Sequence, residues 1–339
     1  MISIKDLARL AGVSPSTISR AVNGKKYVKP EIRERVLALV KETGYVPNSA
    51  ARSMVLQRTF TVGIVIPDTF NMFQRQLFST IERSLEVFGY RTLFYFVKWE
   101  AESELKCLRR LKAEKLDGII MLHEVTHPSF YEYLADGAPP VVLCTFSREG
   151  LTFHSVHVDE VAAAKAATSH LIGLGHRDIG LISGIQFSFG AQRAEGYREA
   201  LRAAEIGYDE SRTVFVPSYT LEDGRLGMMR LLERKAGLTA LFAATDELAI
   251  GAVRALHEAG LRVPDDVSVV GFDDIDITEY LAPALTTIRQ PIQEMGGKTA
   301  AIMSELIAGE KENEGSTVLG FELVVRESSA RLRGLKRRR

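Results

Sequence analysis

The 339-residue sequence contains only two cysteines and no long apolar run. Cys107 and Cys144 do not have the spacing of a metal-binding motif, so we expect buried thiols in a reducing compartment. No hydrophobic stretch approaches the length that spans a bilayer, and residues 1–15 carry charge too early for a secretory signal. These absences predict a cytoplasmic protein with no membrane partner.

The sequence also lacks the short motifs of common enzymes. No serine lies in a nucleophile elbow, and neither HExxH nor a paired-cysteine motif occurs. The Gly-Leu-Gly at residues 173–175 follows a predicted helix and precedes a predicted strand, which is the reverse of a dinucleotide-binding loop. It is therefore predicted to end a helix, with His176 as a turn residue. Without such motifs, we predict no enzyme activity, no cofactor and no metal ion.

The formal net charge of zero conceals two oppositely charged parts. Residues 1–58 hold 11 Lys/Arg and 4 Asp/Glu, a balance of +7, so the rest of the chain carries a balance of −7. A small basic segment before an acidic body indicates that one end meets a polyanion such as nucleic acid. A solvated surface with no partner can have the same composition, so charge alone leaves both interpretations open.

The first 40 residues have the periodicity of three short helices. The apolar stripe of the first helix consists of Ile4, Leu7, Ala8 and Ala11. Gly12 ends that helix where a tight turn needs a positive φ angle, Ser14 is a good N-cap for the second helix, and Pro15 suits its first position. The inward side chains of the third helix, which follows Pro30, are Ile32, Val36, Leu39 and Val40.

The second helix has an apolar inner face, with Ile18 and Val22 four residues apart, and a polar outer face. The outer face repeats at helical spacing through Ser16, Ser19, Arg20 and Asn23. Two short helices joined at a glycine turn, the second with such a face, are typical of a helix-turn-helix. Its Arg20 can donate two hydrogen bonds to a guanine edge in the major groove. The alternative is a three-helix cap whose polar face is only wetted by solvent.

The stretches ISIKDLARLAGVSPSTISRAVNG (residues 2–24) and TGYVPNSAARSM (residues 43–54) resemble the headpiece and hinge of the lac repressor family of bacterial regulators. The resemblance implies that Pro15, Ser16 and Arg20 set operator preference. It also implies a hinge helix at about 48–56, capped by Asn48, which pairs in a dimer and inserts an apolar side chain into the minor groove. The positions implied to bind DNA are Ser14, Pro15, Ser16, Thr17, Ser19, Arg20, Asn23, Tyr27, Asn48, Ala51 and Met54.

Three positions depart from the pattern of that family. Met54 stands where most members have a leucine wedge, and its flexibility predicts a weaker kink at the operator centre. Lys29 replaces the usual hydroxyl cap of the third helix, and Ile32 stands at a commonly hydroxylated position. Because a lysine side chain cannot cap, we expect that helix to begin less firmly.

From residue 60 onward, short apolar strands alternate with amphipathic helices. Strands are expected at residues 61–68, 90–96, 116–122, 139–144, 155–159, 178–184, 212–217, 239–246 and 267–274. Helices are expected between them at 74–88, 101–114, 160–173, 191–205, 223–234 and 246–259. The alternation predicts an α/β fold of doubly wound parallel sheets with sites at the carboxyl ends of the strands. Nine strands are many for one sheet, so we expect two hinged halves with a break near 159–162.

Segments of this body such as HLIGLGHRDIGLISG and LAPALTTIRQP also resemble the lac repressor family. The resemblance implies an all-α helix-turn-helix head at residues 1–58 and an α/β core at 59–339, built from two subdomains like those of periplasmic binding proteins. The amino-terminal subdomain is expected at about 60–159 and 291–320, and the carboxy-terminal one at about 161–289 and 323–339. The chain is then expected to cross between them near 159–161, 289–291 and 320–323.

Residues at predicted strand ends match effector contacts of that family: Phe73, Thr145, Phe146, Asp159, Arg193, Tyr219 and Asp273. Aromatic faces would stack on a sugar or heterocycle, while Arg193, expected to begin a helix, and Asp273 would hold its polar groups. Each aromatic alone also fits core packing, and Asp273 with Asp274 also fits a catalytic pair, metal ligands or a turn cap. Glu160 replaces the asparagine common in the family, which predicts different hydrogen bonds there. A saccharide or a derivative is the expected effector, with a purine-like base as the alternative.

The sequence therefore predicts a transcriptional repressor that binds a pseudo-palindromic operator as a homodimer and responds to a small effector between its subdomains. The tail RLRGLKRRR lacks the apolar heptads of a tetramerising helix, which favours a dimer. Two other classes stay open at this point. A pure sugar-binding protein would be expected to carry a signal peptide, and an enzyme would turn over a small molecule.

Overall fold

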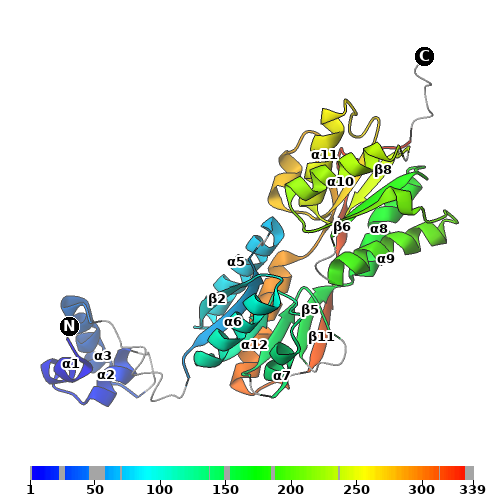
Figure 1. Cartoon of the computed structure of the whole chain (residues 1–339). Helices are drawn as coiled ribbons and strands as arrows, with labels where there is room; N and C mark the ends of the chain where they lie inside the picture. The colour runs from blue at the N-terminus through cyan, green and yellow to red at the C-terminus, as the bar shows by residue number, and fades with distance from the viewer. Residues whose placement is uncertain are drawn as a thin grey trace. The chain divides into compact units, whose positions relative to one another are not determined.

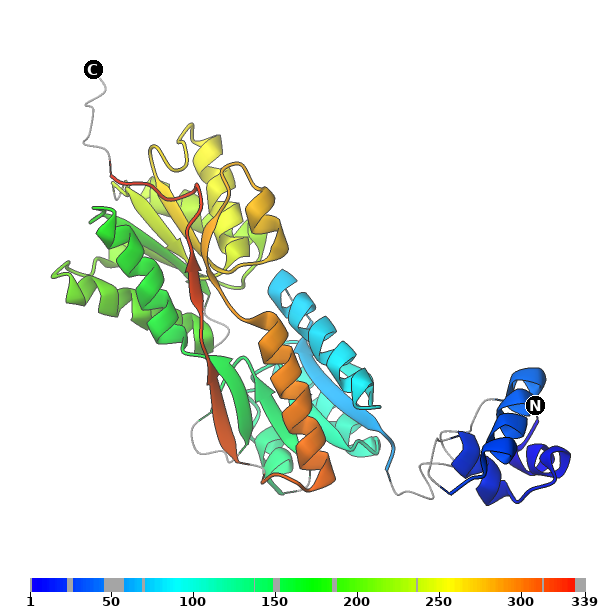
Figure 2. The ribbon, with the colours of Figure 1, turned by 180° about the vertical axis from the view of Figure 1, so that it is seen from behind.

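The chain divides into two compact units, Met1–Thr59 and Phe60–Arg339, in the computed structural model. Within the second unit, two lobes each contain a sheet covered by helices (Figures 1 and 2). The residues that the structure describes are 2–22, 27–45, 58–68, 71–136, 138–148, 153–184, 188–235, 237–312 and 314–332.

Three helices form the described part of the first unit: α1 (Ile4–Ala11), α2 (Pro15–Val22) and α3 (Pro30–Thr43). Gly12 ends α1 in the left-handed conformation, with a φ of 63°, as predicted for this turn. Lys29 is the N-cap of α3 and makes no side-chain capping hydrogen bond to it. The predicted apolar stripes meet in one core that buries Leu7, Ala8, Ala11, Ile18, Ala21 and Val36.

The first sheet of the second unit has six strands in the order β11-β5-β4-β3-β1-β2, all paired in parallel. Alternate strand residues face opposite sides, so Ile64 and Ile66 of β1 pack beneath two helices while Val65 packs beneath two others. Figure 2 shows the first pair, α5 and α12, side by side over the sheet. The strands are β1 (Thr61–Pro67), β2 (Arg91–Val97), β3 (Gly118–Met121), β4 (Val141–Cys144), β5 (His154–Val158) and β11 (Gly315–Leu319). The helices are α5 (Met72–Val87) and α12 (Ile292–Ala308) on one face, and α6 (Ala101–Ala113) and α7 (Pro128–Asp136) on the other.

The second sheet has six strands in the order β12-β10-β9-β8-β6-β7, and β12 is antiparallel to β10 while the other pairs are parallel. Helices α8 and α9 cover one face, and α10 and α11 cover the other. The strands are β6 (Ile179–Gly184), β7 (Thr213–Val216), β8 (Ala240–Ala243), β9 (Ser268–Asp273), β10 (Thr286–Arg289) and β12 (Glu322–Val324). The helices are α8 (Glu160–Gly173), α9 (Ser188–Ala203), α10 (Leu221–Glu233), α11 (Asp246–Glu258) and the 3₁₀ turns η1 (Glu210–Arg212) and η2 (Asp276–Tyr280).

The chain passes between the two sheets three times. It leaves the first sheet after β5 and enters α8, returns between β10 and α12, and leaves again between β11 and β12. Figure 2 shows the last passage as a nearly continuous red ribbon from one lobe to the other. Because each lobe is completed by a later part of the chain, neither lobe is a single continuous segment.

Two local expectations need correction. Strands β10, β11 and β12 were not predicted, because β10 (TTIR) is mostly polar and because β11 and β12 lack a buried apolar run. His176 was expected to be only a turn residue, but its side chain is buried and lies between Thr239 Oγ1 and the Ala330 carbonyl, each at 3.0 Å. This ring ties the chain near its carboxyl end to the second sheet. The Gly-Leu-Gly segment does end α8, as predicted.

Candidate functional site

The outer face of α2 presents short hydroxyl side chains around one long cation. Ser16, Ser19 and Arg20 are exposed, whereas Ile18 and Ala21 on the opposite side are buried in the core of the first unit. Because the side chains around Arg20 are small, this face can approach the floor of a DNA major groove closely. The arrangement suits contact of the long Arg20 side chain with a base edge, and contact of the short serine side chains with DNA atoms nearer to the helix.

The first turn of α2 is organised by Ser14. Its hydroxyl accepts a hydrogen bond from the Thr17 amide at 3.2 Å and lies 2.7 Å from Ser16 Oγ and 2.9 Å from Thr17 Oγ1. Pro15 is exposed at the first helical position. Hydroxyls gathered at a helix N-terminus form a surface suited to a phosphate oxygen.

The remaining predicted DNA contacts lie beyond α2. Tyr27 is 97% exposed, and its φ of 95° is in the left-handed region that few side chains other than glycine adopt. Asn23, Asn48, Ala51, Met54 and the predicted hinge helix lie outside the described residues.

The carboxyl ends of strands from both sheets border a small cavity between the lobes of the second unit. Its volume is about 20 Å³, and its lining comes from Asn71, Phe73, Gln74, Thr145, Glu160, Phe189, Arg193, Thr245, Asp273 and Gln290. A neighbouring cavity of about 160 Å³ shares two of these residues and is lined by Thr145, Phe146, Ser147, His157, Val158, Asp159, Glu160, Gln192 and Val318. We call the two together the cleft. Six of the seven predicted effector contacts line it.

Arg193 lies at the centre of a buried charge cluster in the cleft. Its side chain is 4% exposed, Nε donates to Glu160 Oε2 at 2.7 Å, and Nη1 lies 3.5 Å from Asp273 Oδ1. The guanidinium carbon is 3.6 Å from the ring centroid of Phe272 and 4.6 Å from that of Phe189. Two carboxylates and two aromatic faces therefore hold this cation in one orientation.

The position of Arg193 within its helix differs from the prediction. It was expected to begin a helix but lies in the second turn of α9, which starts at Ser188. The Ser188 amide donates to Glu124 Oε2 at 2.9 Å, and the Ser188 hydroxyl donates to the other oxygen of the same carboxylate. Glu124 belongs to the loop after β3, which is far from α9 in the sequence. Its carboxylate stabilises a start of α9 at Ser188, earlier than the start predicted from the residues of the helix alone.

Asp273 ends β9 with a φ of 123° and is buried. Its Oδ1 accepts a hydrogen bond from Gln290 Nε2 at 2.8 Å. Burial raises the pKa of Asp273 well above its ordinary value, although the nearby Arg193 opposes the change. Asp246, fully buried behind it, has a pKa raised to about 7 by burial. The floor of the cleft thus contains two buried carboxyl groups.

Tyr219 is the predicted effector contact that the structure does not bring to the cleft. Its ring packs 4.8 Å from that of Phe189, and a Cβ placed on Gly184 or Gly190 would fall 2.4 and 2.2 Å from Tyr219 atoms. The two glycines give the tyrosine its space. Tyr219 therefore supports Phe189 from behind, and Phe189 supplies the aromatic surface of the cleft.

Sequence reasoning missed Asn71, Gln74, Phe189, Thr245 and Gln290 as cleft residues. Two of them carry a local signal, because Asn71 and Gln74 form the capping box that begins α5. Thr245 is the N-cap of α11, and its hydroxyl accepts from the Leu248 amide at 3.2 Å. Such caps mark helix starts, which gather with strand ends at one edge of a parallel sheet.

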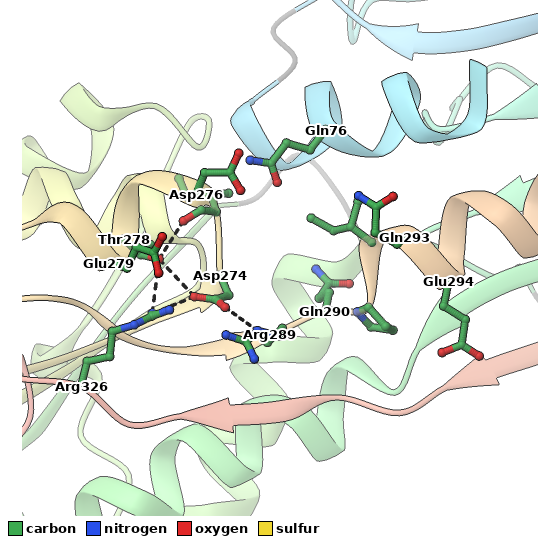
Figure 3. A pocket seen from close by; sticks show the side chains of 13 residues that line it. Gln76, Asp274, Asp276, Thr278, Glu279, Arg289, Gln290, Gln293, Glu294 and Arg326 are labelled. Carbon is green, nitrogen blue, oxygen red and sulfur yellow. Dashed lines mark hydrogen bonds and ion pairs between the residues drawn. The ribbon is translucent and has the colours of Figure 1, made fainter. Parts of the chain in front are cut away.

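The second residue of the Asp273-Asp274 pair holds a turn rather than lining the cleft. Asp274 accepts hydrogen bonds from Arg289 Nε at 2.6 Å and Thr278 Oγ1 at 3.1 Å, and it lies 2.7 Å from Arg326 Nη1. Figure 3 shows it between the two arginines. It lines a cavity of about 510 Å³ that reaches Gln76 and shares Gln290 with the cleft. Among the described residues, no group of three or more His, Cys, Asp or Glu side chains is placed to hold a metal ion.

No helix in the described part of the chain is both long and apolar enough to cross a bilayer.

Comparisons with known proteins cover both units of the chain. The model of "Bacterial regulatory proteins, lacI family" matches residues 3–48, and that of "Periplasmic binding protein-like domain" matches residues 168–329. The ribose operon repressor of Haemophilus influenzae is 33% identical over 329 residues, which covers 97% of this chain and 98% of the relative. The chain belongs to the LacI family. Relatives of this LacI-family protein are named as transcriptional regulators and repressors rather than as enzymes.

Solved structures of LacI-family proteins have the same fold. The lac repressor dimer bound to operator and the anti-inducer ONPF is 26% identical, with a TM-score of 0.86, 97% of this chain covered and 99% of that chain. The complex of transcriptional regulator CelR with cellobiose is 31% identical, with a TM-score of 0.74 and coverage of 97% and 100%. The predicted fold class, a helix-turn-helix head before two α/β subdomains, is confirmed, as is the family resemblance.

Proposed function

We propose that this LacI-family protein is a repressor that binds a pseudo-palindromic operator as a homodimer, and that a sugar or sugar derivative in the cleft controls its operator affinity. The observation that carries the proposal is the outer face of α2. Ser16, Ser19 and Arg20 are presented to solvent by a packed three-helix core, within a segment of net charge +7. Residues 1–58 act as the headpiece, and residues 48–56, with Met54, act as its hinge.

The lining of the cleft supports control by a polyhydroxylated ligand. Phe73 and Phe189 supply aromatic surface, while Arg193, Asp273 and Gln290 supply hydrogen-bonding groups. Two relatives point to the same ligand class, since one is named a ribose operon repressor and a similar structure holds cellobiose. The two cavities of the cleft are small, so an effector of this kind must widen the cleft, and the resulting movement of the lobes would be passed to the headpiece.

An exposed apolar surface on the first sheet supports assembly as a dimer. β2 is an edge strand, and its Phe96 is 55% exposed. Val87 and Phe88 at the end of α5 are 85% and 46% exposed, and Phe78 of α5 packs edge-on against Phe94 at 5.4 Å. Exposed apolar side chains on an edge strand and on the helix before it support an interface on this side of the sheet. A similar structure is described as a dimer bound to operator, which agrees with this surface.

Selection from random DNA, followed by gel shifts, tests the proposal. The full chain is expected to enrich a pseudo-palindrome with affinity that falls steeply with salt. Arg20→Ala is expected to relax discrimination at one base pair of each half-site, at a cost of about 1–3 kcal/mol per half-site.

Arg9→Ala is the matched control, because Arg9 is exposed on α1 and its loss changes the net charge equally. It is expected to weaken binding uniformly and leave base preferences intact. Enrichment of no palindrome would defeat the proposed function, and an unchanged preference in Arg20→Ala would defeat the assignment of Arg20.

A further inference from the structure

Glu160 places a second carboxylate against the arginine of the cleft. Its side chain is 5% exposed, it lines both cavities, and its Oε2 accepts from Arg193 Nε at 2.7 Å. Among the described residues that line the cleft, Arg193 is the one arginine or lysine, whereas the carboxylates are Asp159, Glu160 and Asp273. The cleft therefore contains three carboxyl side chains and one guanidinium, and of these carboxyl groups Glu160 is the one that lines both cavities.

The hydrogen bonds of Arg193 leave little of its guanidinium for an anion. Nε donates to Glu160, and Nη1 donates to the Ala244 carbonyl and lies beside Asp273. Phosphate and carboxylate groups are bound best by two adjacent N–H groups of one guanidinium edge. Each edge includes Nε or Nη1, and both of these already have partners. Nη2, which makes no hydrogen bond to the described residues, is left as a single donor that suits one hydroxyl group.

Helix N-termini, which could otherwise attract an anion, are also occupied at this cleft. The Met72 amide at the start of α5 donates to Glu247 Oε1 at 3.2 Å, and the Ser188 amide at the start of α9 donates to Glu124 at 2.9 Å. Asp159 caps α8 by accepting from the Ala162 amide at 2.9 Å. The starts of α5, α8 and α9 thus each have a carboxylate as acceptor, and the first turn of α11, whose N-cap Thr245 also lines the cleft, contains Asp246 and Glu247.

We propose that Glu160 restricts the cleft to uncharged polyhydroxylated effectors and excludes sugar phosphates and acidic sugars. The inference rests on the proposed function, in which the effector is a sugar or a sugar derivative. It specifies in addition that this effector carries no charge. An anion in this cleft would lie beside the Glu160 carboxylate in surroundings that screen charge poorly. An uncharged sugar avoids this repulsion and still receives a hydrogen bond from Nη2.

The first test compares matched sugars on the full chain by thermal unfolding and calorimetric titration. The probes are ribose against ribose 5-phosphate, glucose against glucose 6-phosphate and glucuronate, and cellobiose. We expect at least one uncharged sugar to raise the unfolding temperature. We expect its charged partner to bind more weakly by a factor of about ten or more. A charged sugar that binds as tightly as its uncharged partner would overturn the proposal.

The second test replaces the carboxylate by an amide. Glu160→Gln keeps an acceptor for Arg193 Nε but removes one charge, so inorganic phosphate and the sugar phosphates are expected to bind about tenfold more tightly than to the unmodified chain. Glu195→Gln is the control, since Glu195 lies on the solvent side of α9 and pairs with Arg198 and Arg202. Phosphate bound by the basic headpiece contributes equally in the unmodified chain and in the two variants. A difference in phosphate affinity among the three therefore reports on the cleft.

The outcomes separate this inference from the proposed function. If a folded Glu160→Gln variant gains no phosphate affinity over both other proteins, Glu160 does not set the charge preference. If the variant gains phosphate affinity while no uncharged sugar binds the unmodified chain, the charge rule holds and the sugar class of the proposed function fails. If Glu160→Gln does not fold, the matched sugars on the unmodified chain decide alone.

Discussion

Two glycines let α10 and α11 touch backbone to backbone over the second sheet. A Cβ on Gly251 of α11 would lie 1.9 Å from the Leu221 carbonyl oxygen, and one on Gly224 of α10 would lie 2.2 Å from the Leu248 carbonyl oxygen. Each glycine thus faces the main chain of the other helix, and no side-chain rotation can relieve a clash with it. These two glycines determine how closely α10 and α11 approach each other over the core that includes Leu241 and Val269.

Gly251→Ala is therefore expected to force the two helices apart and to lower the free energy of unfolding by more than about 2 kcal/mol. Urea denaturation followed by circular dichroism measures this change. Gly297→Ala is the matched control, because Gly297 lies inside α12 where an added Cβ meets nothing within 4 Å. That variant is expected to be neutral or up to about 1 kcal/mol more stable. Equal effects of the two substitutions would contradict the packing argument.

At the scale of elements, carboxylates from one lobe satisfy helix starts of the other. Glu124, which follows β3, accepts from Ser188 at the start of α9, and Glu247 of α11 accepts from Met72 at the start of α5. Free amides at helix N-termini are electropositive, so each contact combines a hydrogen bond with a favourable helix-dipole interaction. The two contacts run in opposite directions between the lobes and hold the cleft narrow.

Glu124→Ala is expected to loosen the first turn of α9. Loss of a charged acceptor there costs about 1 kcal/mol, which corresponds to roughly fivefold faster amide exchange in residues 188–191. Hydrogen–deuterium exchange with mass spectrometry measures it, and the amides of α10 serve as an internal reference. The control is Glu132→Ala, which removes an exposed glutamate of α7 in the same lobe. Unchanged exchange at 188–191 would show that Glu124 does not hold the helix start.

At the scale of the whole molecule, the proposed function requires two copies of the chain. One α2 offers few base contacts, so specific operator binding needs a second copy on the other half-site. The apolar edge formed by β2 and the end of α5 is the surface proposed to join them. Its Phe96 is a large side chain, 55% exposed, on a strand with no further neighbour in the described sheet.

Phe96→Asp is expected to convert the dimer to a 37.5 kDa monomer and to abolish high-affinity operator binding, because a charge would then be buried at the interface. Sedimentation velocity gives the mass. Phe215→Asp is the control, since Phe215 is also an exposed phenylalanine and lies on β7, the edge strand of the second sheet. It should leave the dimer intact. A Phe96→Asp protein that stays dimeric would move the interface elsewhere.

Local pattern was enough to predict most elements of this protein. The stripes through Leu7, Ile18 and Val36 predicted the head helices, and the turn at Gly12 followed from its position between them. Apolar runs such as that of β1 predicted the strands that are buried on both faces. These features depend on neighbours within one or two turns, so periodicity and capping determine them. The family resemblance added the fold class, which the comparisons confirm.

Tertiary structure alone decided the partners of Arg193 and the layout of the cleft. Glu160 and Asp273 reach this arginine from α8 and β9, far away in the sequence, and Glu124 places the helix that carries it. Tyr219 has the residue type of a ligand contact, yet in the structure its ring packs behind Phe189, which lines the cleft in its place. The short strands β10, β11 and β12 pair at or next to the edges of sheets whose other strands lie earlier in the sequence. Such contacts arise only when distant segments meet, because no local period encodes which carboxylate will face which cation.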